Sequence, residues 1–164
     1  MSSNETPPAT ADVRIRDLVE AIGSDCISPG CGAAASLTLA LAAACGAKAV
    51  AVSLKHVTED KDLQEALGYF RGIARRALDG ADRDSEAFAR FLQEQTEEAS
   101  EELVDVVEDV DALAVHLLTQ LDKIAPRIDS RVMGDMIAAR TLAHAARTIE
   151  RRNVTETRLA QEQT

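Results

Sequence analysis

Aromatic residues are nearly missing from this 164-residue chain, which has no Trp, one Tyr and three Phe. Four prolines and eight glycines are too few for a β-sandwich, whose many turns depend on them. Alanine occurs 29 times, and hydrophobic residues make up 46% of the chain. Because Ala is the strongest helix former, the composition predicts an all-α protein, an up-and-down bundle of five or six helices in one domain.

Basic residues are also few, with 18 Lys and Arg against 28 Asp and Glu, which gives a net charge of −10. A protein that binds nucleic acid carries a basic patch to neutralise phosphates, and anionic membrane surfaces attract basic segments. The charge balance therefore argues against nucleic acid and membrane surfaces as partners. The first residues also lack the basic and apolar stretches of a signal peptide, so we expect a cytoplasmic protein.

Residues that commonly hold a metal or a nucleotide are sparse. The three His are far apart, no His-Glu-x-x-His or P-loop pattern occurs, and the three Cys form no Cys-x-x-Cys pair. We expect no metal site and no bound cofactor. Cys31 and Cys45 lie in an apolar stretch, which predicts buried free thiols.

Helix-type spacing of apolar residues predicts six helical segments, at residues 12–22, 33–54, 60–79, 82–95, 97–125 and 132–152. Gly80 is expected to break or bend the chain between two of them. Residues 1–11 are predicted to form a disordered tail, 12–154 the bundle domain, and 155–164 a frayed tail.

The segment 33–54 has no charged residue before Lys48 and consists largely of Ala. A membrane span is one interpretation of such a run, but Ala is weakly hydrophobic and no aromatic or basic residues flank it. A helix that is apolar on all sides is more typical of the centre of a folded domain. Its small side chains allow a close neighbour, which favours a homodimer.

The turn Ser28-Pro29-Gly30-Cys31-Gly32 comes directly before this helix. Backbone N–H groups at a helix N-terminus attract anions, and glycines let a ligand approach closely. The turn is therefore a candidate binding site. A plain helix start, with Ser as cap and Pro in the first turn, explains the same residues.

Four charged residues stand among apolar neighbours, at Lys48, Lys55, Asp84 and Asp135. A Lys on an apolar stripe either extends its ammonium group to solvent or occupies a polar pocket that lowers its pKa. Asp84 fits a helix cap after Gly80, and a carboxylate early in the last helix is favoured by the helix dipole. When buried, either carboxylate is a candidate acid or base.

Four segments occur in a fixed order along the chain: the turn at 28–32, the small-residue helix after it, Asp84-Ser-Glu-Ala87-Phe88, and Gly134-Asp135 opening an Ala-rich helix that ends in Asn153-Val154. In this order and content the chain resembles the cyclodeaminase/methenyltetrahydrofolate cyclohydrolase family, over roughly residues 13–92 and 131–154. The resemblance implies an all-helical homodimer that binds a tetrahydrofolate derivative in a cleft lined by these motifs.

Several positions depart from the family's pattern. Cys31 replaces the middle Gly of the turn, Ala33 the Ser that follows it, Ala51 an Asn, and Gly134 the Ser before the late Asp. The stretch between Phe88 and the acidic helix is also shorter than usual by about twenty residues, and it lacks the family's Arg and its Thr- and Pro-containing helix. These departures would change the folate pocket, so the resemblance alone does not establish that folate activity is retained.

The resemblance implies Asp135 as the acid or base and Asp84 as an orienting or substrate-binding group. Phe88 is implied as a substrate-binding residue. The positive charges of Lys48 and Lys55 would offset the carboxylates of a folate, as would the N–H groups of the turn residues Gly30, Cys31 and Gly32.

The first expectation is water addition to the methenyl bridge, since no transferase domain is attached. Formimidoyltetrahydrofolate cyclodeaminase is the alternative reaction. The alternative outside enzymes is a binding protein: a non-catalytic helical dimer that binds a small anion or a protein partner.

Overall fold

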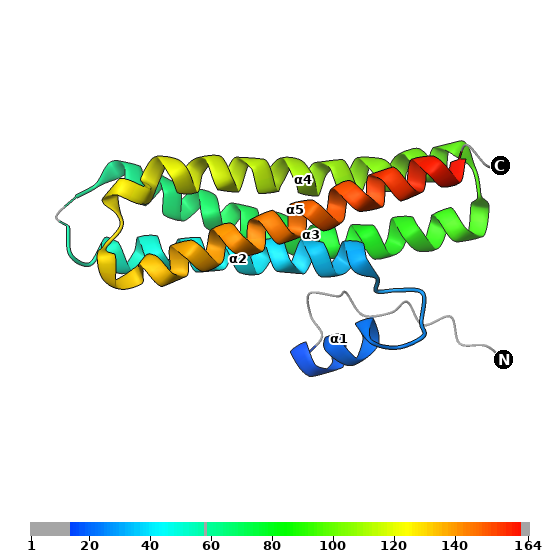
Figure 1. Cartoon of the computed structure of the whole chain (residues 1–164), viewed down its shortest axis with the longest axis horizontal. Coiled ribbons are helices and arrows are strands. Elements are labelled where there is room, and N and C mark those ends of the chain that lie inside the picture. Colours follow the sequence, from blue (N-terminus) through cyan, green and yellow to red (C-terminus); the bar gives the residue numbers. More distant parts are fainter. Residues whose placement is uncertain (1–13, 58, 162–164) are drawn as a thin grey trace.

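The computed structural model describes residues 14–57 and 59–161. It contains five α-helices and two short 3-10 turns, and no strand occurs in these ranges (Figure 1). The helices are α1 (Ile15–Ile22), α2 (Cys31–Ser53), α3 (Lys61–Glu94), α4 (Glu97–Ile124) and α5 (Met133–Gln161). The all-α prediction is confirmed. The predicted tail at residues 1–11 lies outside the described residues.

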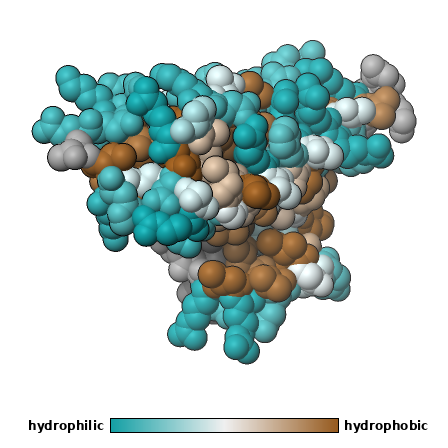
Figure 2. Space-filling model, turned by 60° about the vertical axis from the view of Figure 1, so that its left-hand side comes forward, coloured by the Kyte–Doolittle hydropathy of each residue, from teal (hydrophilic) through white to brown (hydrophobic). Residues whose placement is uncertain are grey.

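The four long helices lie side by side and alternate in direction along the chain, as in an up-and-down bundle (Figure 1). Helix α2 packs against α3 and α5, and α4 packs against the same two helices on the other side. The short α1 lies apart from the bundle and has no buried residue. Hydrophobic residues are concentrated on the surface between α1 and the bundle (Figure 2).

Small side chains on α2 set how closely its neighbours approach. Ala42, Ala43 and Ala49 are completely buried. A Cβ atom added at Gly46 would lie 3.1 Å from Leu121 of α4 and 3.2 Å from Phe70 of α3. The sequence prediction of a central helix is therefore confirmed, and its alanines and glycine allow close contact with three other helices.

The predicted break at Gly80 is wrong, because α3 runs unbroken from Lys61 to Glu94. Gly80 is buried, and a Cβ there would lie 3.1 Å from Val110 of α4 and 3.5 Å from Ser36 of α2. The glycine thus permits close helix packing and does not interrupt the helix.

Helix α5 continues to Gln161, beyond residue 154, where the sequence placed the end of the domain. An ion pair of 2.7 Å joins Arg158 to Glu108 of α4 and lies in this extension. At its start, the backbone N–H of Asp129 donates to Ser53 Oγ, which fixes the chain before α5 to the end of α2.

Among the described residues, α2 alone is long and apolar enough to cross a membrane. In the structure 56% of the most apolar 18-residue stretch of this helix is buried inside the bundle. The central helix of a folded domain has the same length and composition, so the apolar run is explained by packing.

We expect Ala43→Leu to destabilise the protein by about 1–3 kcal/mol, because the larger side chain has no free volume between the helices. Ala112→Leu on the exposed side of α4 is the matched control and should leave the free energy of unfolding nearly unchanged. Denaturant melts of both variants measure this difference. Equal stability of the two variants would mean that this face of α2 is not packed.

Candidate functional site

A cavity of about 360 Å³ lies where the first turn of α2 meets α3, α4 and α5. Its apolar wall comes from the turn before α2 and from α3 and α4, and consists of Ile27, Phe88, Phe91, Leu103 and Val107. Its polar groups come from the start of α2, from α3 and from α5, and include Gly30, Cys31, Gly32, Asp84 and Asn153. Glu156 and Thr157 of α5 also line it, and of its two acidic residues Asp84 is buried and Glu156 is exposed.

Asp84 packs directly against the first turn of α2. Its side chain accepts a hydrogen bond from the backbone N–H of Ala33, and the residue is only 8% exposed. A Cβ atom at Gly32 would lie 2.0 Å from Oδ1 of Asp84, so the carboxylate occupies the space that any other residue at position 32 would fill. Asp84 is thus an interior residue of α3, and the interpretation of it as a helix cap after Gly80 is wrong.

The environment of Asp84 changes its proton affinity. Burial raises the pKa of Asp84 to about 6, while the hydrogen bond from Ala33 acts in the opposite direction. An acid with this pKa exists in both forms near neutral pH, which is the range in which a side chain can accept a proton and return it. Asp84 therefore has the properties of a general acid or base.

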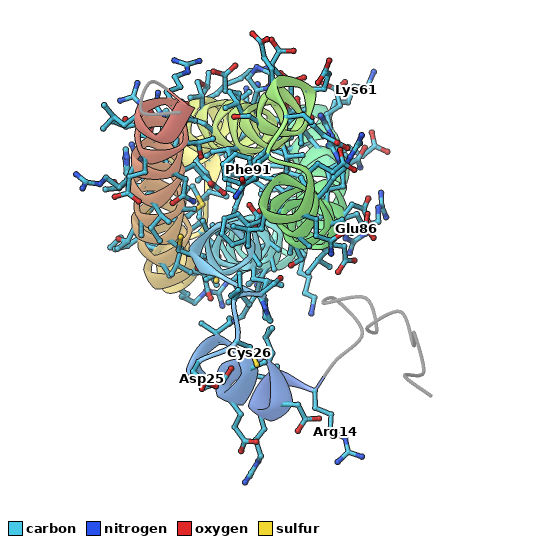
Figure 3. The ribbon with its side chains drawn as sticks, turned by 90° about the vertical axis from the view of Figure 1, so that its right-hand side faces the viewer. Arg14, Asp25, Cys26, Lys61, Glu86 and Phe91 are labelled. Carbon is cyan, nitrogen blue, oxygen red and sulfur yellow. The ribbon has the colours of Figure 1, made fainter. Side chains whose placement is uncertain are left out.

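Two aromatic rings line the cavity one turn apart on α3. The rings of Phe88 and Phe91 are stacked, with centroids 6.5 Å apart and planes inclined by 28°. Phe91 points between the helices, whereas Glu86 extends outward from the other side of α3 (Figure 3). The pair gives an aromatic, apolar side to the cavity that Asp84 also lines.

A short chain of hydrogen bonds joins the start of α2 to α5. The thiol of Cys31 donates to Asn153 Oδ1 over 3.2 Å, and Asn153 Nδ2 donates to Glu150 Oε2 over 3.2 Å. Cys31 is exposed, so the prediction of a buried thiol there is wrong, and Cys45 is only partly buried. The Cys31 thiol borders the cavity because Cys31 is the first residue of α2, and α2 begins at the cavity.

Glu150 is a buried acid that the sequence analysis missed, with 1% of its surface exposed. It lies in an Ile-Glu-Arg-Arg run that is typical of a solvated surface. The missed signal was periodicity, since Glu150 follows the buried Ala139, Ala143 and Ala146 at helical steps. Burial, and then the charge of Asp84, raises the pKa of Glu150 to about 8.

The structure brings together five of the predicted site residues, Gly30, Cys31, Gly32, Asp84 and Phe88. It places the other three elsewhere in the chain. Lys48 Nζ lies 2.9 Å from Asp135 Oδ1, in an ion pair between α2 and α5. Since Lys48 follows Cys31 by 17 residues, this pair is about 25 Å along α2 from the cavity, and Lys55 is farther still.

Lys48 extends to solvent, with a side chain that is 66% exposed. Its hydrogen bond to Asp135 raises the pKa of Lys48, the reverse of what a polar pocket that favoured the neutral amine would produce. Of the two interpretations of this lysine, the structure supports the extended, charged one.

The described residues contain no group of three His, Cys, Asp or Glu side chains that could hold a metal ion. The polar groups at the cavity are the carboxylates of Asp84 and Glu156, an amide, a thiol, a hydroxyl and backbone N–H groups. These groups can bind a small organic molecule and exchange protons with it.

Comparisons with known proteins identify the fold and the family of the chain. A crystal structure of formiminotetrahydrofolate cyclodeaminase from Thermotoga maritima is similar in fold, with a TM-score of 0.83 at 21% sequence identity. The match covers 89% of this chain and 78% of that one. No curated protein matches the chain. The sequence model of the formiminotransferase-cyclodeaminase family matches residues 14–156, and the chain belongs to this family.

Proposed function

We propose that this protein acts on the one-carbon group of a reduced folate, with Asp84 as the general acid and base. One observation carries the proposal: a buried carboxyl with a pKa of about 6 lies in a mainly apolar cavity at the start of α2. Family membership supports the substrate class, since the family is defined by a formimino-group transferase and a cyclodeaminase.

The charge of Asp84 indicates which part of a folate enters the cavity. The carboxylate already accepts the N–H of Ala33 in the first turn of α2, and a second anion beside it would be repelled. The positively charged methenyl bridge, or an ammonium leaving group, would be attracted instead. The turn residues therefore suit the one-carbon end of the substrate better than its carboxylates.

The aromatic pair supports the same orientation. The rings of Phe88 and Phe91 line the same cavity as the carboxylate and offer an aromatic, apolar surface. A planar ring system that carries delocalised positive charge is stabilised by such a surface through burial and cation–π attraction. We infer that the fused ring of the folate lies along these side chains.

In the cyclohydrolase reaction, water attacks the methenyl carbon that bridges two nitrogens. Asp84 in its charged form accepts a proton from this water as the carbon–oxygen bond forms. The protonated Asp84 then gives the proton to the departing ring nitrogen as the carbon–nitrogen bond breaks. The hydroxyl that came from the water releases its remaining proton to solvent, which leaves a formyl group on the other nitrogen. One carboxyl with a pKa near neutrality performs both transfers.

The cyclodeaminase reaction is the second candidate, and the fold shared with a formiminotetrahydrofolate cyclodeaminase favours it. Here the second nitrogen of the future bridge, an amine outside the fused ring, attacks the formimino carbon, and ammonia leaves. Asp84 accepts the proton of the attacking nitrogen and donates one to the departing ammonia. The cyclohydrolase consumes the methenyl compound, whereas the cyclodeaminase produces it. One assay of the near-ultraviolet absorbance of this compound therefore distinguishes them, by loss of signal in the first case and gain in the second.

Asp84→Asn should reduce the rate of either reaction by about 100-fold or more, because the amide keeps the size but transfers no proton at neutral pH. Asp79→Asn, on the exposed side of the same helix, is the control and should keep the wild-type rate. The rates are followed by absorbance of the methenyl compound, with the cyclic substrate and with the formimino substrate.

Asp135→Asn tests the competing assignment, since the family resemblance implies Asp135 as the acid or base. A large loss in this variant together with normal turnover in Asp84→Asn would transfer the role to Asp135. Wild-type protein with no rate above buffer for either substrate would favour the non-catalytic binding protein.

We also propose that the protein forms a homodimer through its exposed apolar face. Leu41 of α2 and Ile137 of α5 are 60% and 61% exposed, and Ile15 and Val19 of α1 are 79% and 63% exposed. Figure 2 shows hydrophobic side chains gathered on the exposed surface of the molecule. An eight-residue helix with no buried side chain needs a partner surface, and a second copy would supply one.

Sedimentation equilibrium at micromolar concentration should give about twice 17.6 kDa for the wild type. Ile137→Asp should shift the protein toward the monomer, because it places a charge in the apolar contact. Tyr69→Asp, at a 42% exposed position on α3, is the control and should remain dimeric. A monomeric wild type would overturn the proposed dimer.

A further inference from the structure

Asn153 is a cavity residue to which the proposed reaction gives no role. It belongs to α5 and lines the cavity together with Asp84 and the two aromatic residues of α3. Its side chain is an uncharged amide, which has two N–H groups and an oxygen with two lone pairs. Such a group recognises a ligand by donating one hydrogen bond and accepting another, so its specificity depends on the direction in which the amide points.

Two neighbours fix the direction of this amide. The nitrogen Nδ2 donates to Oε2 of Glu150 over 3.2 Å, and the oxygen Oδ1 accepts from the thiol of Cys31 over 3.2 Å. A half-turn of the amide would bring its oxygen against the Glu150 oxygen and separate it from the thiol hydrogen. The observed direction is therefore the one in which each donor faces an acceptor.

Burial strengthens the hold of Glu150 on Asn153. Only 1% of the surface of Glu150 is exposed, so water competes little for its oxygens. A buried polar group is costly unless it is hydrogen-bonded, and Asn153 supplies that bond. Glu150 itself borders a different cavity, between α4 and α5, so its connection to the cavity of Asp84 runs through Asn153.

The amide of Asn153 keeps hydrogen-bonding capacity for a ligand. Its bonds to Glu150 and Cys31 use one N–H group and one lone pair, which leaves one of each. Because both belong to one planar group with a fixed direction, they match a ligand edge on which an acceptor and a donor stand side by side in one order. Asparagine pairs in this way with the edge of a heterocyclic base.

We propose that Asn153 is a specificity-determining residue that binds the lactam edge of the folate's fused ring, and that Glu150 is the positioning residue that fixes the direction of its amide. The inference rests on the proposed function and deepens it. On a lactam edge a ring N–H stands next to a carbonyl oxygen. Oδ1 of Asn153 accepts from the ring N–H, and Nδ2 donates to the carbonyl oxygen.

Equilibrium binding of two compounds tests the role of Asn153. The first is tetrahydrofolate, and the second is its analogue in which an amino group replaces the ring carbonyl oxygen, so that donor and acceptor exchange places on the edge. Asn153→Ala should shift the ratio of the two dissociation constants by about 10-fold or more toward the analogue, because the amide that rejects the reversed edge is gone. Thr148→Ala, at an exposed position of α5 outside the cavity, is the control and should keep the wild-type ratio. All these variants retain Asp84, so an attraction between its carboxylate and the more basic analogue is the same in each.

Two substitutions of Glu150 test its positioning role. Glu150→Met keeps the length of the side chain but removes the acceptor, and should shift the ratio in the same direction by about threefold or more because the amide can then turn. Glu150→Gln still offers an oxygen to Nδ2 of Asn153 and should keep the wild-type ratio. Circular dichroism melts check that each variant folds. The side-chain amide signals of Asn153 in ¹⁵N NMR give a readout that needs no substitution at position 150, since tetrahydrofolate should shift them in the wild type.

An unchanged ratio in Asn153→Ala, or Asn153 amide signals that are indifferent to tetrahydrofolate, would overturn the inference. A folded Glu150→Met with the wild-type ratio would overturn the role of Glu150. Turnover of a reduced folate together with an unchanged ratio in Asn153→Ala would refute the inference and leave the proposed function intact. A wild type that binds neither compound would refute the proposed function, and the inference with it.

Discussion

The contact between the carboxylate of Asp84 and the first turn of α2 determines how the site is built. It exists because position 32 has no side chain, since a Cβ there would overlap the carboxylate oxygen at 2.0 Å. The same contact buries Asp84, supplies its hydrogen bond from Ala33 and raises its pKa to about 6. The backbone of one helix and the side chain of another thus create a proton-transferring group in an apolar cavity.

The close packing of the bundle makes this contact possible. Alanine and glycine on α2, together with Gly80 on α3, bring the helix axes near enough for a short side chain such as Asp84 to reach the neighbouring backbone. Longer residues in these places would separate the helices and admit water around the carboxylate. The small number of aromatic residues therefore favours the close helix packing on which the site depends. Two of the three Phe line the cavity.

Periodicity and composition predicted the features that depend on single helices, while the features that depend on contacts between helices were missed. The central helix at 33–54 and the turn at 28–32 could be identified from local pattern, whereas Phe88 was implied by the family resemblance. Gly80 was misinterpreted because a glycine that breaks a helix and one that lets helices touch look alike in sequence. The pairing of Lys48 with Asp135, far from the cavity, followed from helix packing, which no motif encodes.

The most direct measurement of the central claim compares alanine at two glycines, each of which is the second residue of a helix. At Gly32 the added Cβ must displace the Asp84 carboxylate, whereas at Gly134 nothing lies within 4 Å of it. The account predicts that Gly32→Ala lowers turnover of the reduced folate by about 100-fold at pH 7, while Gly134→Ala keeps the wild-type rate. Full activity of Gly32→Ala, in a protein where Gly134→Ala is also active, would contradict the claim that Asp84 acts from its place against α2.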